Sequence, residues 1–239
     1  MIPKKPAPDV IRGWVPIFGK DHAQRSISVL ALVLGGGIMR VALGVVLACL
    51  LSLSAAAGDI DPAVATAFQG WGLPVPGAGS LIFCHGYNCN FRTQIGISTA
   101  DRGQLAALMQ PGRASPDAER RAVAKTEAWF EKRVAPQTGT AHAKARASVG
   151  WGIGGDPGQF DCVDTTANTT SLLVVLTRLG LLRHHDVSTP ISRLLAGGPH
   201  FTATMQEKRS GQRWTVDPWT HDNGELPDVW KIERWSAGG

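Results

Sequence analysis

Three residues of types that cooperate in nucleophilic catalysis occur in the order Cys162, His200 and Asp217. Cys162 heads an apolar stretch of helical character, and the N–H groups at a helix N-terminus favour thiolate over thiol. His200 follows a Gly-Gly-Pro turn at the start of a predicted strand, and Asp217 lies in the next strand, WTVDPW. A cysteine nucleophile, a histidine base and an aspartate that orients the histidine form a triad for acyl transfer.

Two carboxylates flank the candidate nucleophile. Asp161 and Asp164 lie on either side of Cys162 in the sequence, and a nearby negative charge raises the pKa of a thiol. Either aspartate could instead cap the helix by accepting hydrogen bonds from its first N–H groups. The competing interpretation of Cys162 is a small buried residue that packs the start of the helix.

The pairing of the two predicted strands also matters for the triad. A tight turn centred on residues 210–211 would set Asp217 opposite Thr204 rather than His200. Contact between the aspartate and the histidine therefore requires a wider loop or a bulge. Without that contact, His200 is an ordinary structural histidine.

The first 57 residues are predicted to be absent from the working protein. From Met39 the sequence has a short basic start, an apolar core and a small-residue Ala-Ala-Ala end, which is the pattern of a secretory signal peptide over residues 39–57. Met39 is then the start of translation, and residues 1–38 are an upstream extension. Two alternatives are a membrane anchor through residues 28–57 and lipid attachment at Cys49.

Charge excludes nucleic-acid binding as the main function. Residues 1–57 hold six of the 24 Lys and Arg and two of the 19 Asp and Glu. The rest of the chain has 18 basic and 17 acidic residues, without a basic stripe. We expect a periplasmic or secreted protein with one domain over residues 81–239, preceded by a loose N-terminal arm over residues 58–80. After removal of the signal peptide we expect no stable membrane insertion.

Cys84 and Cys89 are the other cysteines beyond the leader, five positions apart in FCHGYNCNF. In an oxidising compartment they are expected to close a small loop by a disulfide and to leave Cys162 free. A second interpretation makes Cys84, His85 and Cys89 metal ligands, although no further ligand pair is visible for the fourth position that zinc normally needs. In a third, both cysteines stay reduced in the core.

Capping signals and periodicity predict the elements that position these residues. Helices are expected over residues 99–109, 115–134 and 162–179. Extended segments are expected over residues 81–97, with an interruption at the Cys-Gly turn, and over residues 187–195, 200–208 and 213–220. The third helix is apolar nearly all round and is predicted to be central and buried. Pro136 is expected to lie beyond the second helix, and the tryptophans of the tail are expected to pack back on the domain.

Residues 155–220 resemble the transglutaminase-like superfamily of cysteine peptidases and amidases. That family has a cysteine at the head of a Leu-rich core helix, a histidine that opens a strand, and an aspartate in a W-x-x-D-P pattern on the next strand. The matching segments are GQFDC, which ends at Cys162, the Pro-His pair at His200, and WTVDP, which contains Asp217. The family often has an aromatic residue two positions after the histidine, where this chain has Thr202.

The resemblance implies an α+β domain with a papain-like core, in which the helix that bears the cysteine packs on an antiparallel β-sheet. It implies Cys162 as nucleophile, His200 as general base and acid, and Asp217 as the orienting residue. An oxyanion hole would use the backbone N–H of Cys162 and a side chain near Gln159. The implied activity is hydrolysis of a peptide or protein substrate through an acyl-enzyme, with no cofactor or metal, and transfer to an amine is the variant of the same chemistry.

Two rival functions use other features of the sequence. The first is an exported binding or envelope-associated domain that keeps the fold without catalysis. The second is a small metal or redox module built on Cys84, His85 and Cys89. A triad in poor register or a deeply buried Cys162 would favour the first, and stoichiometric zinc would favour the second.

Overall fold

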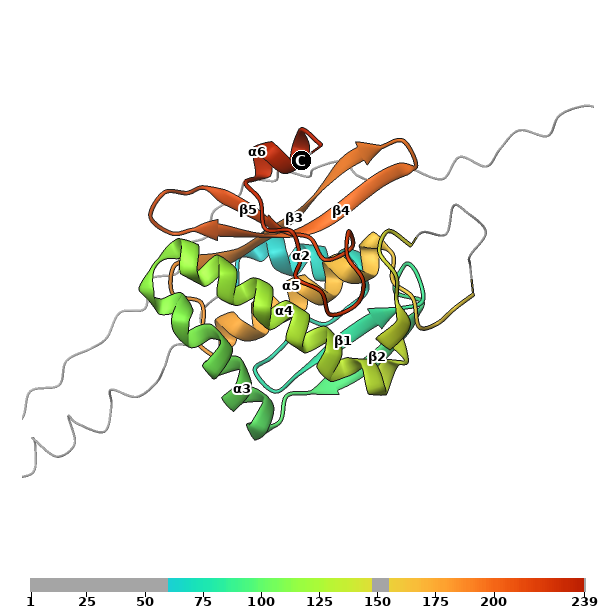
Figure 1. The fold of residues 1–239 in the computed structure, drawn as a ribbon, viewed down its shortest axis with the longest axis horizontal. Helices are drawn as coiled ribbons and strands as arrows, with labels where there is room; N and C mark the ends of the chain where they lie inside the picture. Colours follow the sequence, from blue (N-terminus) through green and yellow to red (C-terminus); the bar gives the residue numbers. More distant parts are fainter. Residues whose placement is uncertain (1–59, 148–154, 239) are drawn as a thin grey trace, which may run out of the picture. The chain divides into compact units, whose positions relative to one another are not determined.

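Two antiparallel sheets and five α-helices form the described part of the chain, residues 60–147 and 155–238 of the computed structural model (Figure 1). The elements in chain order are α2 (Pro62–Gly70), β1 (Ser80–His85), β2 (Phe91–Gly96), α3 (Thr99–Met109), the 3-10 helix η1 (Gln110–Ala114), α4 (Pro116–Thr138), the 3-10 helix η2 (Thr140–His142), α5 (Cys162–Arg178), β3 (His185–Leu195), β4 (Gly198–Glu207), β5 (Arg213–Val216) and α6 (Ile232–Ser236). The α+β class expected from the sequence is therefore confirmed.

The predicted signal peptide, the upstream extension, the alternative membrane anchor and Cys49 lie outside the described residues. Within the residues that are described, no helix is both long and apolar enough to cross a membrane.

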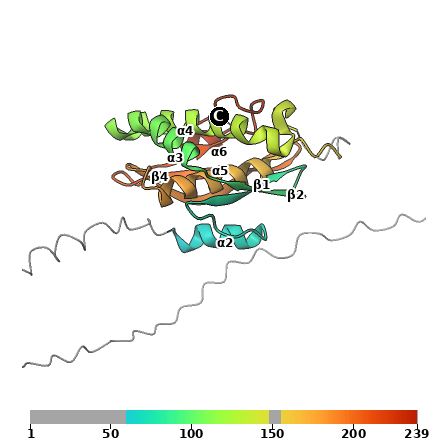
Figure 2. The same cartoon turned by 90° about the horizontal axis from the view of Figure 1, so that it is seen from below.

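Helix α5 is the centre of the domain. It packs on β3 and β4 of the three-stranded sheet and on β1 of the two-stranded sheet. Figures 1 and 2 show α3 and α4 on one side of this layer and α2 on the other. The run from Leu172 to Leu176 is at most 1% exposed because neighbours surround it. A helix that is apolar nearly all round must be covered in this way, as the sequence predicts.

Local sequence signals account for the ends of the two helices on the α4 side. Ser98 and Asp101 form a reciprocal capping box at the start of α3. Ser115 caps α4, which starts at Pro116. Proline is favoured at this first position because an N–H there would have no partner within the helix. The prediction that Pro136 lies beyond α4 is wrong, because the helix continues to Thr138. Only one backbone hydrogen bond is forgone there, in the last turn.

The segment predicted as a loose arm contains a helix instead. The carboxylate of Asp61 accepts a hydrogen bond from the N–H of Ala63 and caps α2. Val64 and Phe68 lie four positions apart, share one face of the helix and are fully buried. The many Gly, Pro and Ala residues around this short pattern conceal it in the sequence.

The turn between β4 and β5 decides where the triad aspartate lies. The N–H of Glu207 donates to the carbonyl of Gln212, so four residues form the turn, two more than in a tight hairpin. Ala203 consequently pairs with Val216. If this register is continued by one residue, Asp217 lies opposite Thr202. His200 is two positions before Thr202 on the same face of the sheet, so it is the diagonal neighbour of Asp217. The wider loop that the sequence analysis requires is present.

Candidate active site

Cys162 is the first residue of α5, and both neighbouring aspartates cap this helix. The Oδ1 of Asp161 accepts hydrogen bonds from the N–H groups of Val163 at 3.0 Å and Asp164 at 2.9 Å. Oδ2 of Asp164 accepts one in return from the N–H of Asp161 at 3.1 Å. This capping box uses the amides next to Cys162, while the N–H of Cys162 itself points to its own sulfur, where an oxyanion would form.

The Cys162 thiol lies against the first residues of β4. Its Sγ is 3.8 Å from the carbonyl oxygen of Pro199, and the N–H of Phe201 donates to the sulfur. These two contacts fall on either side of His200 in the chain. Cys162 as a residue is neither fully buried nor fully exposed.

His200 and Asp217 form a buried pair. Nε2 of the ring is 2.7 Å from Oδ2 of the carboxylate, and each residue is 1% exposed. Because a carboxylate only accepts, Nε2 carries the proton and Nδ1 of the neutral ring has a free lone pair. Among the residues that the structure describes, Nδ1 of His200 has no hydrogen-bond partner. It is the ring atom free to accept a proton from a thiol.

Two tryptophans enclose this pair. The indole Nε1–H of Trp235, on α6, donates to Oδ2 of Asp217 at 2.7 Å. The centroid of the Trp235 ring is 5.4 Å from that of the His200 ring, and the centroid of the Trp219 ring is 4.4 Å from it. Arg193 stacks over the Trp235 ring and donates to its backbone carbonyl. Trp235 thus helps to orient Asp217.

The sequence analysis missed this role of Trp235. It expects only that the tail tryptophans pack on the domain. A tryptophan near the C-terminus carries no local signal that its N–H reaches an aspartate 18 positions earlier.

The charge environment opposes a free thiolate at Cys162. Burial raises the pKa of the thiol to about 11, the N–H of Phe201 acts against this, and the charges of Asp161 and Asp217 raise it further. The lowering expected from the helix N-terminus is therefore outweighed. At neutral pH the thiol holds its proton unless a base takes it.

Gln159 lies in the loop before α5 and holds two other segments. Its Oε1 accepts a hydrogen bond from the N–H of Lys144 at 2.9 Å, and its backbone carbonyl accepts one from the N–H of Gly86 at 2.7 Å. The side-chain Nε2 is the only donor that remains for an oxyanion. That role stays a prediction.

Cys84 and Cys89 are joined in a disulfide, and Cys162 is a free cysteine. His85 donates from Nδ1 to the carbonyl of Pro157 and accepts at Nε2 from the hydroxyl of Thr93. All three residues of the alternative metal site are thus otherwise engaged. Over residues 60–147 and 155–238, no group of three or more His, Cys, Asp or Glu could hold a metal ion.

A cavity of about 410 Å³ lies away from the triad. Its lining includes Asp186, Ser188, Gln206 and Lys208, from β3, β4 and the turn that follows. The reacting groups are not part of it. The chemistry of the site therefore depends on the partly exposed face of Cys162 rather than on this cavity.

Comparisons with protein-family models, with curated proteins and with solved structures find no match for this chain.

Proposed function

We propose that the protein is an exported, transglutaminase-like cysteine hydrolase that cleaves amide bonds of a peptide or protein substrate. One observation carries the proposal: the Cys162 thiol touches the backbone on both sides of His200, whose ring bonds Asp217. A papain-like core is supported by the position of Cys162 at the start of a helix that packs on the antiparallel β3–β4–β5 sheet. His200 and Asp217 are paired as base and orienting residue, whereas the Cys162 thiol and Nδ1 of His200 are not hydrogen-bonded in this structure, so the proposal requires them to meet when substrate binds.

The reaction starts with proton transfer from the thiol to Nδ1 of His200. The sulfur attacks the carbonyl carbon, and the oxyanion that forms is stabilised by the N–H of Cys162. The imidazolium gives its proton to the leaving amine as the C–N bond breaks. Water then attacks the thioester with the same histidine as base, which releases the acid and restores the thiol.

Asp217 makes this proton transfer possible in a buried site. An imidazolium that is 1% exposed lacks solvation by water, and the carboxylate at 2.7 Å compensates its charge. The imidazolium in turn compensates a thiolate beside it. A thiol whose pKa is raised to about 11 next to a neutral ring is therefore activated only as an ion pair with His200.

The Cys84–Cys89 disulfide supports the export part of the proposal. Disulfides form and persist in oxidising compartments and are rare in the bacterial or eukaryotic cytosol. The predicted signal peptide over residues 39–57 agrees with this location.

The experiment that tests the triad is alkylation of Cys162 by iodoacetamide from pH 4 to pH 11, with adducts located by mass spectrometry. In the wild type we expect the pH midpoint of the alkylation rate to lie well below that of an ordinary thiol. In His200→Ala we expect it to lie above, because the burial and the carboxylate charges that raise the pKa of the thiol remain. His184→Ala is the matched control, since His184 bonds Arg113 at a distant point of the chain. Identical profiles in all three proteins would exclude the triad.

An inactive binding domain is the second candidate, and the raised pKa of Cys162 favours it. In that case the thiol is a buried polar group that packs β4 against α5. The pH midpoint of its alkylation would then match the raised pKa of the thiol, both in the wild type and in His200→Ala. Accumulation of an acyl group on Cys162 during incubation with peptide amides or thioesters, detected by mass, would exclude this candidate.

A further inference from the structure

The loop between β1 and β2 has four consecutive residues in the left-handed backbone region. The φ angles are 73° at Gly86, 68° at Tyr87, 53° at Asn88 and 55° at Cys89. Side-chain-bearing residues rarely adopt this conformation, and almost never in a row. Such a run points successive N–H groups toward one side, where they form an anion-binding concavity. The first of these N–H groups donates to the carbonyl of Gln159.

The other three N–H groups bind the two carboxylates that cap α5. The N–H groups of Tyr87 and Cys89 donate to Oδ2 and Oδ1 of Asp164 at 2.8 and 2.7 Å. The N–H of Asn88 donates to Oδ2 of Asp161 at 2.8 Å. The concavity is thus filled by the residues on either side of the candidate nucleophile.

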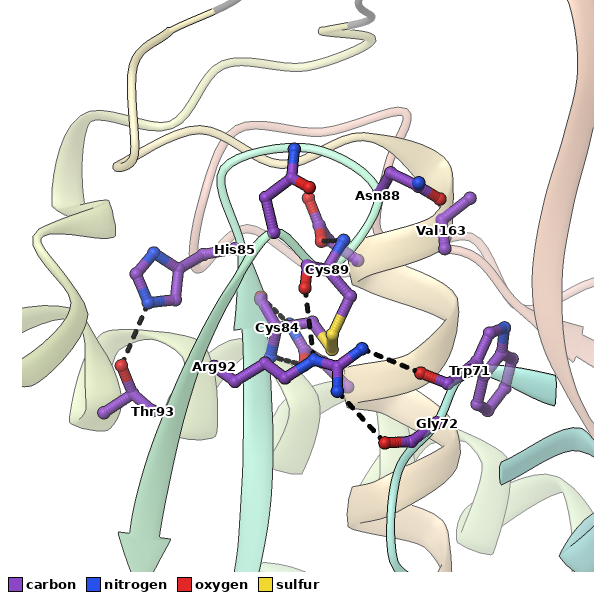
Figure 3. The surroundings of a disulfide bond; sticks show 12 residues. Trp71, Gly72, Cys84, His85, Asn88, Cys89, Arg92, Thr93 and Val163 are labelled. Carbon is purple, nitrogen blue, oxygen red and sulfur yellow. Dashed lines mark hydrogen bonds between the residues drawn. A yellow bond between two sulfur atoms is a disulfide. The ribbon is translucent and has the colours of Figure 1, made fainter. Parts of the chain in front are cut away.

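The disulfide closes this loop, and Asn168 of α5 ties the Cys84 end of it to the helix. The backbone of Cys84 is fixed by the side chain of Asn168, which accepts from its N–H at 2.7 Å and donates to its carbonyl at 2.8 Å. Cys89 is held to Cys84 by the S–S bond (Figure 3). Arg92 adds a hydrogen bond to the carbonyl of Cys89. The left-handed run is therefore closed between two fixed points.

We infer that the Cys84–Cys89 loop is a positioning element for Cys162, which holds both capping carboxylates and screens the charge of Asp161 from the sulfur. The role in catalysis rests on the proposed function, whereas the effect on the thiol is independent of it. Both half-cystines are buried, with at most 4% of their surface exposed, so the loop is built to stay closed.

The charged and titratable groups around the sulfur set the direction of the effect. Burial, the charge of Asp161 at the N-cap of α5 and the charge of Asp217 after β5 raise the pKa of the thiol, while His200 on β4 is its proposed base. Asp164 is the other half of the capping box, Tyr87 donates to it through its N–H, and the pKa of each is raised by burial. When the loop opens, Asp161 loses an N–H partner and its charge acts more strongly on the sulfur. The thiol then ionises at higher pH.

The test compares the alkylation profile of Cys162 in the wild type and in the Cys84→Ala/Cys89→Ala double variant. We expect the midpoint to rise by about one pH unit and the rate at neutral pH to fall about tenfold without the disulfide. Gly86→Ala keeps the disulfide but disturbs the loop, since its Cβ would lie 2.4 Å from the ring of Phe91. The same shift is expected there, so the test survives if the double variant does not fold.

Loss of stability alone is controlled with Phe68→Leu, a core change on α2 chosen to match the fall in melting temperature. It should leave the midpoint unchanged well below its melting temperature. The comparison is repeated in the His200→Ala background, where the loop effect should persist even if the triad fails. Unchanged midpoints in both loop variants, or an equal shift in Phe68→Leu, would overturn the inference.

Discussion

Replacement of Trp235 by phenylalanine tests how far the Asp217 carboxylate depends on its second donor. The indole N–H donates to Oδ2 at 2.7 Å, and both residues are at most 1% exposed. A hydrogen bond to a charged group contributes about 1.5–3 kcal/mol. The smaller ring also leaves a gap that costs about 1–2 kcal/mol. We therefore expect the free energy of unfolding to fall by roughly 2.5–5 kcal/mol.

A double-mutant cycle separates the hydrogen bond from the packing. Urea unfolding of the wild type, Trp235→Phe, Asp217→Ala and the double variant is followed by far-UV circular dichroism. The coupling energy should be about 1.5–3 kcal/mol, because the bond exists in the wild type alone. Trp230→Phe is the control, since this half-buried ring stacks with Arg234 instead. A coupling below about 0.5 kcal/mol would mean that Trp235 acts only by packing, which refutes the reasoning.

Three further predictions concern buried polar groups. Burial raises the pKa of Glu127 on α4, and burial together with the charge of Glu127 raises that of Glu131. The folded protein then holds protons that the unfolded chain releases above its ordinary pKa of 4.5. The free energy of unfolding should fall as the pH rises from there, by up to about 1.4 kcal/mol per pH unit for each proton, and Glu127→Gln should reduce this slope in urea unfolding. Glu119 accepts hydrogen bonds from two backbone amides and from buried His185, so Glu119→Gln should cost about 2–4 kcal/mol by the same measurement. Asn168→Ala leaves two backbone groups of β1 unpaired and should cost about 2–4 kcal/mol, read from thermal unfolding.

Each of these has an outcome that contradicts it. A wild type whose free energy of unfolding is constant between about pH 5 and pH 8 would mean that Glu127 and Glu131 are ionised in the fold. Losses below about 1 kcal/mol in Glu119→Gln or Asn168→Ala would mean that water or a shifted side chain replaces the lost partner.

The central helix and the three strands after it could be predicted because their signals are local. The capping residues at Asp161, the apolar run and Gly180 mark the helix, and alternation marks the strands. The distance between His200 and Asp217, by contrast, depends on the length of the turn between β4 and β5, which the sequence does not determine. Two residues more or fewer in that turn move Asp217 along β4 by a full pair, and no local signal chooses between four-residue and two-residue turns of this composition.

Other parts of the candidate site depend on contacts distant in sequence. The left-handed run after β1 exists because Asp161 and Asp164, more than 70 positions later, accept its N–H groups. Nothing in the Tyr-Asn-Cys sequence predicts this conformation. The pKa of Cys162 is likewise set by burial and by Asp217, so the helix N-terminus alone gives the wrong direction.

The short spacing of the disulfide has a consequence for the order of events when the newly made chain meets an oxidant. Cys84 and Cys89 are five positions apart, whereas Cys162 lies 73 and 78 positions away from them. The entropy of loop closure alone favours the local pair by about 50-fold. Oxidation thus consumes the two structural thiols with each other first. Among the cysteines that the structure describes, Cys162 is then left without an intramolecular partner and reaches the folded state reduced, which is the form that a nucleophile requires.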